Sequence, residues 1–126
     1  MNGDKATQDA ALIQALWPES PPSRQVYAIV DGARSRQIAA AVRLSRLHYE
    51  CLFHGELSRE LATAAPYIVN LVPQADFTRY LLRSGWGRSW GIFVTAARDS
   101  TVTQIRRHLR KQFRVCDEQG AVYFFR

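Results

Sequence analysis

The stretch from Gly85 to Phe93, GWGRSWGIF, contains the pattern G-x-S-x-G, in which the serine of many hydrolases is the nucleophile. Asp99 and His108 follow Ser89 in the chain order that a hydrolase triad requires. A nucleophile elbow needs a strand before the serine and a helix after it, because that turn lifts the hydroxyl above the sheet. The sequence around Ser89 predicts a helix before it and a strand after it. A small serine hydrolase using Ser89 therefore remains only as the least favoured functional alternative.

Two other kinds of chemical site are disfavoured by spacing. The glycines at Gly85, Gly87 and Gly91 form G-x-G-x-x-x-G between a predicted helix and a predicted strand, which is the reverse of the order in a dinucleotide-binding loop. None of the three histidines has a His or Cys companion at metal-ligand spacing. We expect no metal and no cofactor.

The charge of the chain makes anionic partners worth considering. The 126 residues carry a formal net charge of +6, and all 17 basic residues except Lys5 and Lys111 are arginine. One predicted helix shows Arg36, Arg43 and Arg46 on one face. A second group falls within nine positions near the C-terminus: Arg106, Arg107, Arg110, Lys111 and Arg114. Nucleic-acid readers usually add exposed aromatic side chains or a known motif, and neither is visible here, so a basic nucleic-acid-binding module is the second alternative.

Hydrophobic periodicity predicts an alternation of helices and strands. No apolar run approaches the roughly 20 residues needed to span a bilayer, and the N-terminus does not resemble a secretory signal, so we expect a cytoplasmic protein without membrane contact. The predicted helices cover about 7–17, 35–47, 57–64, 76–85 and 101–113, and the predicted strands cover 26–31, 49–53, 66–71, 90–95, 113–116 and 121–125. This order predicts an α/β fold, α+β-like in character, with a single mixed sheet, flanking helices and a C-terminal hairpin.

The predicted domain organisation has two parts. Residues 1–24 form an N-terminal helix and a proline-rich linker, and residues 25–126 form the α/β lobe.

Several residues are expected to mark the ends of helices. Ser35 and Asp76 are expected to cap helices, and Thr101 and Gln104 form a capping-box pattern. Gly85 is expected to end a helix with positive φ, and the basic residues of the last helix are expected to point outward.

Six sequence blocks occur together in a distinctive order. They are YAIVDGA (Tyr27 to Ala33), CLFHGEL (Cys51 to Leu57), APYIVNL (Ala65 to Leu71), GWGRSWGIF (Gly85 to Phe93), HLRKQFRV (His108 to Val115) and the closing VYFFR. The series resembles the type VI secretion effector adaptor (chaperone) family, the DUF4123 domain, over nearly the whole chain from Gln25 on.

The resemblance implies a non-enzymatic adaptor that holds a toxic effector in the bacterial cytoplasm and loads it onto a VgrG-type spike-tip protein. Members of that family carry a mainly helical lobe after the α/β lobe, and their terminal strand continues into an aromatic-Asp-Pro-Arg run. This sequence ends at Phe125 and Arg126, so the resemblance implies an N-terminal fragment.

An adaptor needs rigid surface for its partners, and indole and guanidinium groups bury large areas while still making directed hydrogen bonds. On this interpretation the candidate partner-binding residues are Trp86, Arg88, Trp90, Arg107 and Arg110. The bulky indole of Trp90 also fits a core position in the predicted strand. The apolar strand from Ala121 to Phe125 is predicted to favour self-association if nothing covers it.

Overall fold

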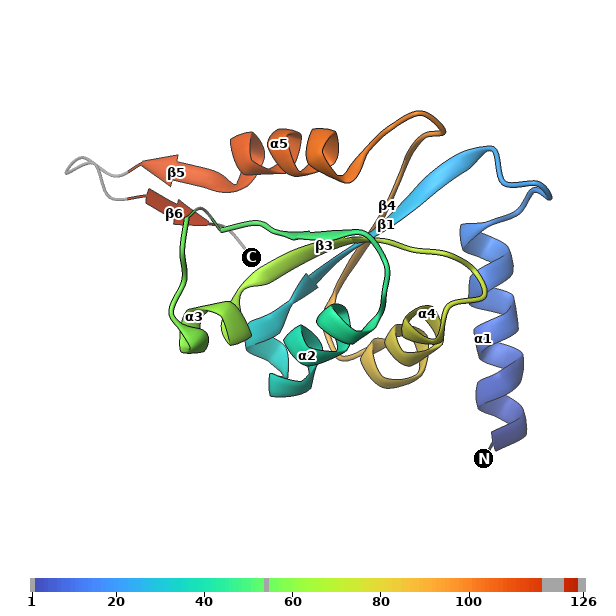
Figure 1. Cartoon of the computed structure of the whole chain (residues 1–126). Coiled ribbons are helices and arrows are strands. Elements are labelled where there is room, and N and C mark those ends of the chain that lie inside the picture. Colours follow the sequence, from blue (N-terminus) through green and yellow to red (C-terminus); the bar gives the residue numbers. More distant parts are fainter. Residues whose placement is uncertain (1, 54, 117–121, 125–126) are drawn as a thin grey trace.

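The centre of the structure is a four-stranded sheet with the strand order β2-β3-β1-β4 (Figure 1). The structure is a computed structural model that describes residues 2–53, 55–116 and 122–124. Side chains are described for residues 8–53 and 55–110. The strands are β1 (Arg24–Asp31), β2 (Tyr49–Cys51), β3 (Pro66–Asn70) and β4 (Gly91–Ala97). The α/β class is confirmed.

The sheet differs from the mixed one that the sequence predicts, because every described strand pair in it is antiparallel. The helix-bearing connections do link strands that run in the same direction, β1 with β2 and β3 with β4. In each case, however, an antiparallel strand lies between the two. This is the split β-α-β arrangement of ferredoxin-like sheets. The order of helices and strands in the sequence therefore predicts which strands a helix connects. It does not predict that β3 lies between β1 and β2, or that β1 lies between β3 and β4.

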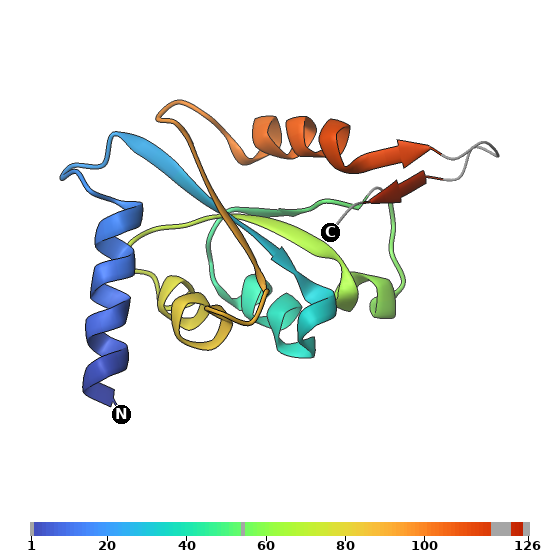
Figure 2. The same ribbon diagram turned by 180° about the vertical axis from the view of Figure 1, so that it is seen from behind.

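One face of the sheet is covered by α2 (Arg36–Leu44), α3 (Arg59–Ala64) and α4 (Asp76–Tyr80), and the other by α5 (Val102–Phe113), as Figures 1 and 2 show. Successive side chains of a strand point to opposite faces, so the central strand β1 contributes to two cores. Val26, Ala28 and Val30 join Ile38 and Val42 of α2 on the first face. A second cluster forms under α5 from Tyr27, Ile68, Leu52, Val102 and Leu109.

Local capping fixes where the helices begin. The Ser35 hydroxyl accepts a hydrogen bond from the backbone N–H of Gln37 at the start of α2, as predicted. Before α5, Gln104 N–H donates to the Thr101 hydroxyl while the Gln104 side chain accepts from Thr101 N–H, which confirms the capping box. Asp76 does not cap α4. It is the first helical residue, after Ala75, and its carboxylate lies 3.8 Å from Arg79.

Two short turns complete the connections around the sheet. The turn η1 (Gly32–Arg34) follows β1, and its N-cap Asp31 accepts a hydrogen bond from Ala33 N–H. The π-helical turn η2 (Leu81–Gly85) continues directly from α4 and leads into the segment before β4. The sequence predicts one helix across residues 76–85, and the structure divides it into these two elements.

The N-terminal helix α1 (Asn2–Leu16) begins earlier than predicted and leads through a proline-containing segment into β1. Its Asp9 carboxylate is buried and accepts a hydrogen bond from Arg83 of η2, which holds the helix against the lobe.

At the C-terminal end of the chain, β5 (Arg114–Cys116) and β6 (Val122–Phe124) pair antiparallel. The predicted hairpin is thus present as a separate two-stranded sheet, while its turn and the outer positions Ala121 and Phe125 lie outside the described residues.

In the residues that the structure describes, none of the helices combines the length and the apolar character that crossing a membrane requires.

Candidate partner-binding surface

The segment between η2 and β4 carries three of the five predicted partner-binding residues. Trp86 is 49% exposed, and Arg88 is exposed beside it. Trp90 is buried, with its ring centroid 5.5 Å from that of Tyr80. Trp86 and Arg88 therefore form surface, and Trp90 supports that surface from within the core.

Close packing around Trp90 explains why glycine stands at Gly85. A Cβ atom added there would lie 2.9 Å from Cε3 of the Trp90 indole, which is closer than ordinary packing allows. Positive φ, predicted for Gly85, occurs instead at Gly87 (φ 77°), where nothing lies within 4 Å of an added Cβ. Gly85 therefore fits the indole, and Gly87 shapes the turn.

The position of Trp90 corrects a detail of the predicted strand. Simple alternation places Trp90 on the same face as Ile92 and Val94, but Trp90 lies in the cluster under α2 and α4. The strand begins only at Gly91, after Ser89 with φ 59°, so the chain turns before regular alternation starts. The indole is thereby directed away from the face on which Ile92 lies.

A hollow of about 350 Å³ lies beside this segment. Trp86 forms one wall, and its ring is stacked near that of Phe93, with centroids 6.4 Å apart and planes inclined by 28°. Ala28, Val30 and Leu81 line its inner part. The lining is mainly apolar, so the hollow offers room for a bulky apolar side chain at the surface.

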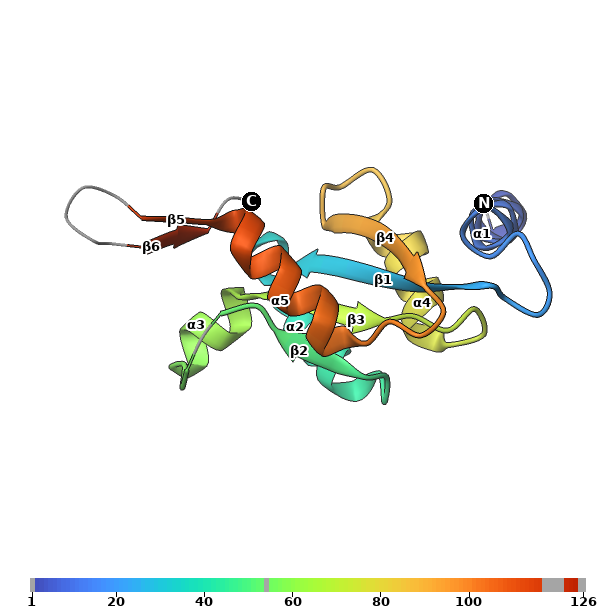
Figure 3. The same cartoon turned by 90° about the horizontal axis from the view of Figure 1, so that it is seen from above.

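The hollow lies next to an open edge of the sheet. In Figure 3 β4 is the outermost strand on its side, and the strand order agrees. Ile92 on β4 is 55% exposed. Figure 3 shows α5 lying over the other strands of the sheet. Trp86 and Ile92 are two of the five large apolar residues that are exposed in the described part of the chain. Sequence patterns showed only an apolar run at this strand, with no sign that it forms an edge.

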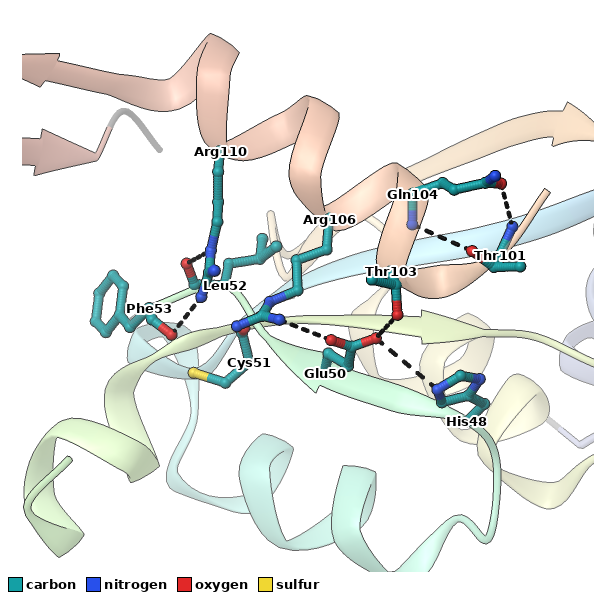
Figure 4. A network of polar contacts seen from close by, with 10 residues as sticks. All are labelled: His48, Glu50, Cys51, Leu52, Phe53, Thr101, Thr103, Gln104, Arg106 and Arg110. Carbon is teal, nitrogen blue, oxygen red and sulfur yellow. Dashed lines mark hydrogen bonds and ion pairs between the residues drawn. The ribbon is translucent and has the colours of Figure 1, made fainter. Parts of the chain in front are cut away.

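The opposite edge of the sheet is closed by arginines of α5 (Figure 4). Arg110 donates from Nε to the Leu52 carbonyl oxygen at 2.9 Å and from a terminal nitrogen to that of Phe53 at 2.7 Å. Arg106 donates to the carbonyl oxygen of Cys51 at 2.9 Å and to the Glu50 carboxylate at 2.8 Å. Both arginines were expected to point outward. They point to the end of β2 instead, because carbonyl oxygens there lie within their reach.

Glu50 has further partners at the same edge, a role for which no sequence pattern provided a signal. Its carboxylate accepts a hydrogen bond from the Thr103 hydroxyl at 2.7 Å and lies 3.9 Å from Nε2 of His48 (Figure 4). Of the two partner-binding residues predicted on α5, Arg107 is exposed and Arg110 is half-buried in this network. Of these two, Arg107 is the one whose side chain is open to a partner.

The residues of the hydrolase alternative are not brought together. Ser89 precedes β4 and Asp99 follows it, and the seven residues of this strand span about 20 Å. Ser89 also precedes a strand, where an elbow serine would precede a helix. Across the residues that the structure describes, no group of three or more His, Cys, Asp or Glu side chains is placed to hold a metal ion.

Comparison of the sequence with known families gives a match over most of the chain. A family model described as a domain of unknown function, DUF4123, matches residues 26–126, which run from β1 through the hairpin. No curated protein and no solved structure matches the chain. The matched range includes the hollow, the open strand and the arginine network. The chain therefore belongs to the DUF4123 family.

Proposed function

We propose that this chain is a non-enzymatic adaptor that acts in the bacterial cytoplasm. It binds a toxic effector and helps to load it onto a VgrG-type spike-tip protein of a type VI secretion system. The resemblance of the six sequence blocks to effector adaptors motivates the biological role. The observation that carries the proposal is the apolar hollow beside the open strand β4, with Trp86 exposed at its wall.

This surface has the features of a protein-binding site. Trp86 combines a large apolar ring with one N–H donor, and aromatic anchors of this kind dominate many protein interfaces. Arg88 lies next to it without an ion-pair partner among the described side chains, so it is available to an acidic group. Gly85 and Trp90 hold the segment in place from beneath, which lowers the entropy lost when a partner binds.

A pull-down from the bacterium that makes the protein tests the proposal. The tagged chain is incubated with lysate and washed at moderate salt, the retained proteins are identified by mass spectrometry, and the eluate is scanned at 260 nm. Recovery of a spike-tip protein or of a toxin supports the adaptor role. Recovery of nucleic acid that is released steeply by salt supports the basic nucleic-acid-binding module instead.

Trp86→Ala and Leu44→Ala make a matched pair for this experiment. Both remove a large exposed apolar side chain, but Leu44 lies on α2, away from the hollow, and is 81% exposed. We expect loss of the partner with Trp86→Ala and retention with Leu44→Ala. Equal retention by both variants would show that the hollow is not the binding surface.

A further inference from the structure

The backbone of β4 presents an unused row of hydrogen-bonding groups. Asp31 N–H donates to the Trp90 carbonyl oxygen at 2.7 Å, so Asp31 and Trp90 occupy a hydrogen-bonded position of the β1-β4 ladder. In an antiparallel ladder such hydrogen-bonded positions recur at every second residue. The backbone N–H and C=O groups of Ile92, Val94 and Ala96 therefore point toward β1. The N–H and C=O groups between them, at Gly91, Phe93 and Thr95, therefore point away from the sheet.

These outward groups have no partner in the part of the chain that the structure describes. The contrast with the other edge is direct, because at β2 the guanidinium groups of Arg106 and Arg110 occupy the carbonyl oxygens of Cys51 and Phe53. Proteins commonly protect an open edge with charged residues or proline. The sequence of β4, GIFVTAA, contains neither.

The side chains beside this edge suit an apolar strand. On one face of β4, Ile92 is exposed next to the half-buried Ile29, its partner on β1. On the other face, Phe93 and Trp86 border the hollow of about 350 Å³. An added strand would place alternate side chains on both faces, one against Ile92 and the next toward the hollow.

Charge at the two ends of β4 indicates what kind of strand fits. Arg88 is exposed just before the strand, and Arg24 and Arg98 are exposed at its far end, where Arg24 lies opposite Ala97. None of these three arginines forms an ion pair among the described side chains. With the exposed Asp99 counted, Arg24 and Arg98 still give the far end a net positive charge. The near end carries the exposed Arg88 and, across the ladder opposite Trp90, the half-buried Asp31.

A second copy of the chain fits this edge poorly. If two β4 strands paired antiparallel about a two-fold axis at Phe93, each Arg88 would lie opposite Arg98 of the other copy, since their numbers are symmetric about 93. Two pairs of like charges would then face each other at the ends of the interface. A strand with acidic ends has the complementary charge.

We infer that β4 binds an extended segment of a partner protein by strand addition, with alternating apolar residues in its middle and acidic residues at its ends. The inference rests on the proposed adaptor function and names the part of the partner that the adaptor holds. The segment would extend the four-stranded sheet beyond β4, insert one bulky apolar side chain into the hollow, and meet Arg88 and Arg98 with its acidic ends.

Selection from a random peptide library on phage, against the full 126-residue chain, tests this even while the partner is unidentified. Thr95→Pro removes one outward N–H and places a ring at the edge, at a position where proline leaves the β1-β4 ladder intact. Thr95→Val is the control, because it keeps the N–H and the β-branched shape. The selected peptides should alternate apolar residues between acidic ends and should bind Thr95→Pro about tenfold more weakly than Thr95→Val.

Charge reversal tests the acidic ends separately. Arg88→Glu should weaken the selected peptide about threefold, whereas Arg36→Glu, at an exposed position on α2, should leave binding unchanged. A further measurement uses the wild-type chain, so that no result depends on the folding of a variant. In an added strand, every second peptide N–H points toward β4 and the others point away. Methylating the nitrogens of the first set should abolish binding, and methylating those of the second set should leave it unchanged.

Three outcomes would overturn strand addition: selection that yields no consensus, a peptide that binds Thr95→Pro as well as it binds Thr95→Val, or methylation that has the same effect for both sets of nitrogens. Sedimentation that shows a wild-type dimer dispersed by Thr95→Pro would assign the edge to a second copy and would overturn it too. The pull-down separates the two proposals. A spike-tip protein or toxin retained equally by the wild type and Thr95→Pro would leave the adaptor function standing and remove the strand-addition model.

Discussion

Arg110 donates from Nε to the carbonyl oxygen of Leu52 across 2.9 Å, although 58 residues separate Leu52 from Arg110 in the chain. Leu52 N–H donates to the Pro66 carbonyl oxygen on β3, so in a regular antiparallel pair the Leu52 oxygen would accept from residue 66 in return. Proline has no N–H to give. The guanidinium of Arg110 supplies the missing donor, and α5 is thereby fixed to the β2 edge.

Replacing Arg110 with methionine should therefore destabilise the fold. The change leaves two carbonyl oxygens without a charged donor, at an expected cost of about 2 kcal/mol in the free energy of unfolding. Arg107→Met is the matched control, since Arg107 is exposed on the same helix and should cost less than about 0.5 kcal/mol. Urea unfolding of the two variants measures the difference, and equal stabilities would contradict the role of Arg110.

Gly85→Ala should destabilise the protein because the new Cβ would lie 2.9 Å from the Trp90 indole, at an expected cost of about 2 kcal/mol. The same substitution in a Trp90→Leu background should cost much less, because the clashing ring is absent. Gly87→Ala controls for backbone effects: its φ of 77° makes alanine unfavourable by about 1 kcal/mol, with or without Trp90. Thermal unfolding of the single and double variants measures the loss of stability caused by Gly85→Ala with and without the Trp90 indole. An equal loss in both backgrounds would exclude the clash as its cause.

Tyr80→Phe should stabilise the protein. The Tyr80 hydroxyl is buried and has no hydrogen-bond partner in the part of the chain that the structure describes. Its ring contacts those of Phe77 and Trp90, contacts that phenylalanine retains. Removing the hydroxyl should raise the free energy of unfolding by about 1 kcal/mol, measured by urea denaturation at neutral pH. A loss of stability would show that the hydroxyl has a favourable contact.

The same hydroxyl predicts a loss of stability at alkaline pH. Burial raises the pKa of Tyr80, and burial is also the first cause of the raised pKa of Tyr67. A raised folded-state pKa contributes stability that is complete below the unfolded value of about 10 and is lost as the pH rises through the folded value. Unfolding at pH 8 and above pH 10 should show this decline, and Tyr80→Phe should make it smaller. An unchanged slope in Tyr80→Phe would assign the decline to other groups.

Much of the fold follows from local sequence patterns. The run VYAIVD predicts a buried strand, and β1 is indeed covered on both faces, with Val26 and Tyr27 in different clusters. The stripe that includes Val102 and Leu109 predicts the buried face of α5, which is confirmed. These predictions succeed because each depends on neighbours within one element.

The arginines of α5 and the open edge of β4 could not be predicted in the same way. A helix pattern shows that Arg106 and Arg110 lie off the apolar stripe, but not that the end of β2 lies within their reach. The residues of β4 likewise do not reveal that β4 is an outer strand, since strand order depends on contacts between distant segments. Of the predicted site, Trp86, Arg88 and Arg107 lie at the surface, whereas Trp90 and Arg110 are held in internal contacts.

We propose that this chain is an adaptor that holds its protein partner at the surface around Trp86. The most direct test is a binding titration between the purified chain and a spike-tip protein or toxin encoded by the same bacterium, with wild type, Trp86→Ala and Leu44→Ala compared under identical conditions. We expect saturable binding by the wild type and by Leu44→Ala, and binding by Trp86→Ala that is weaker by about tenfold or more. Absence of binding by the folded wild type to both kinds of protein, or equal affinities for all three chains, would contradict the proposal.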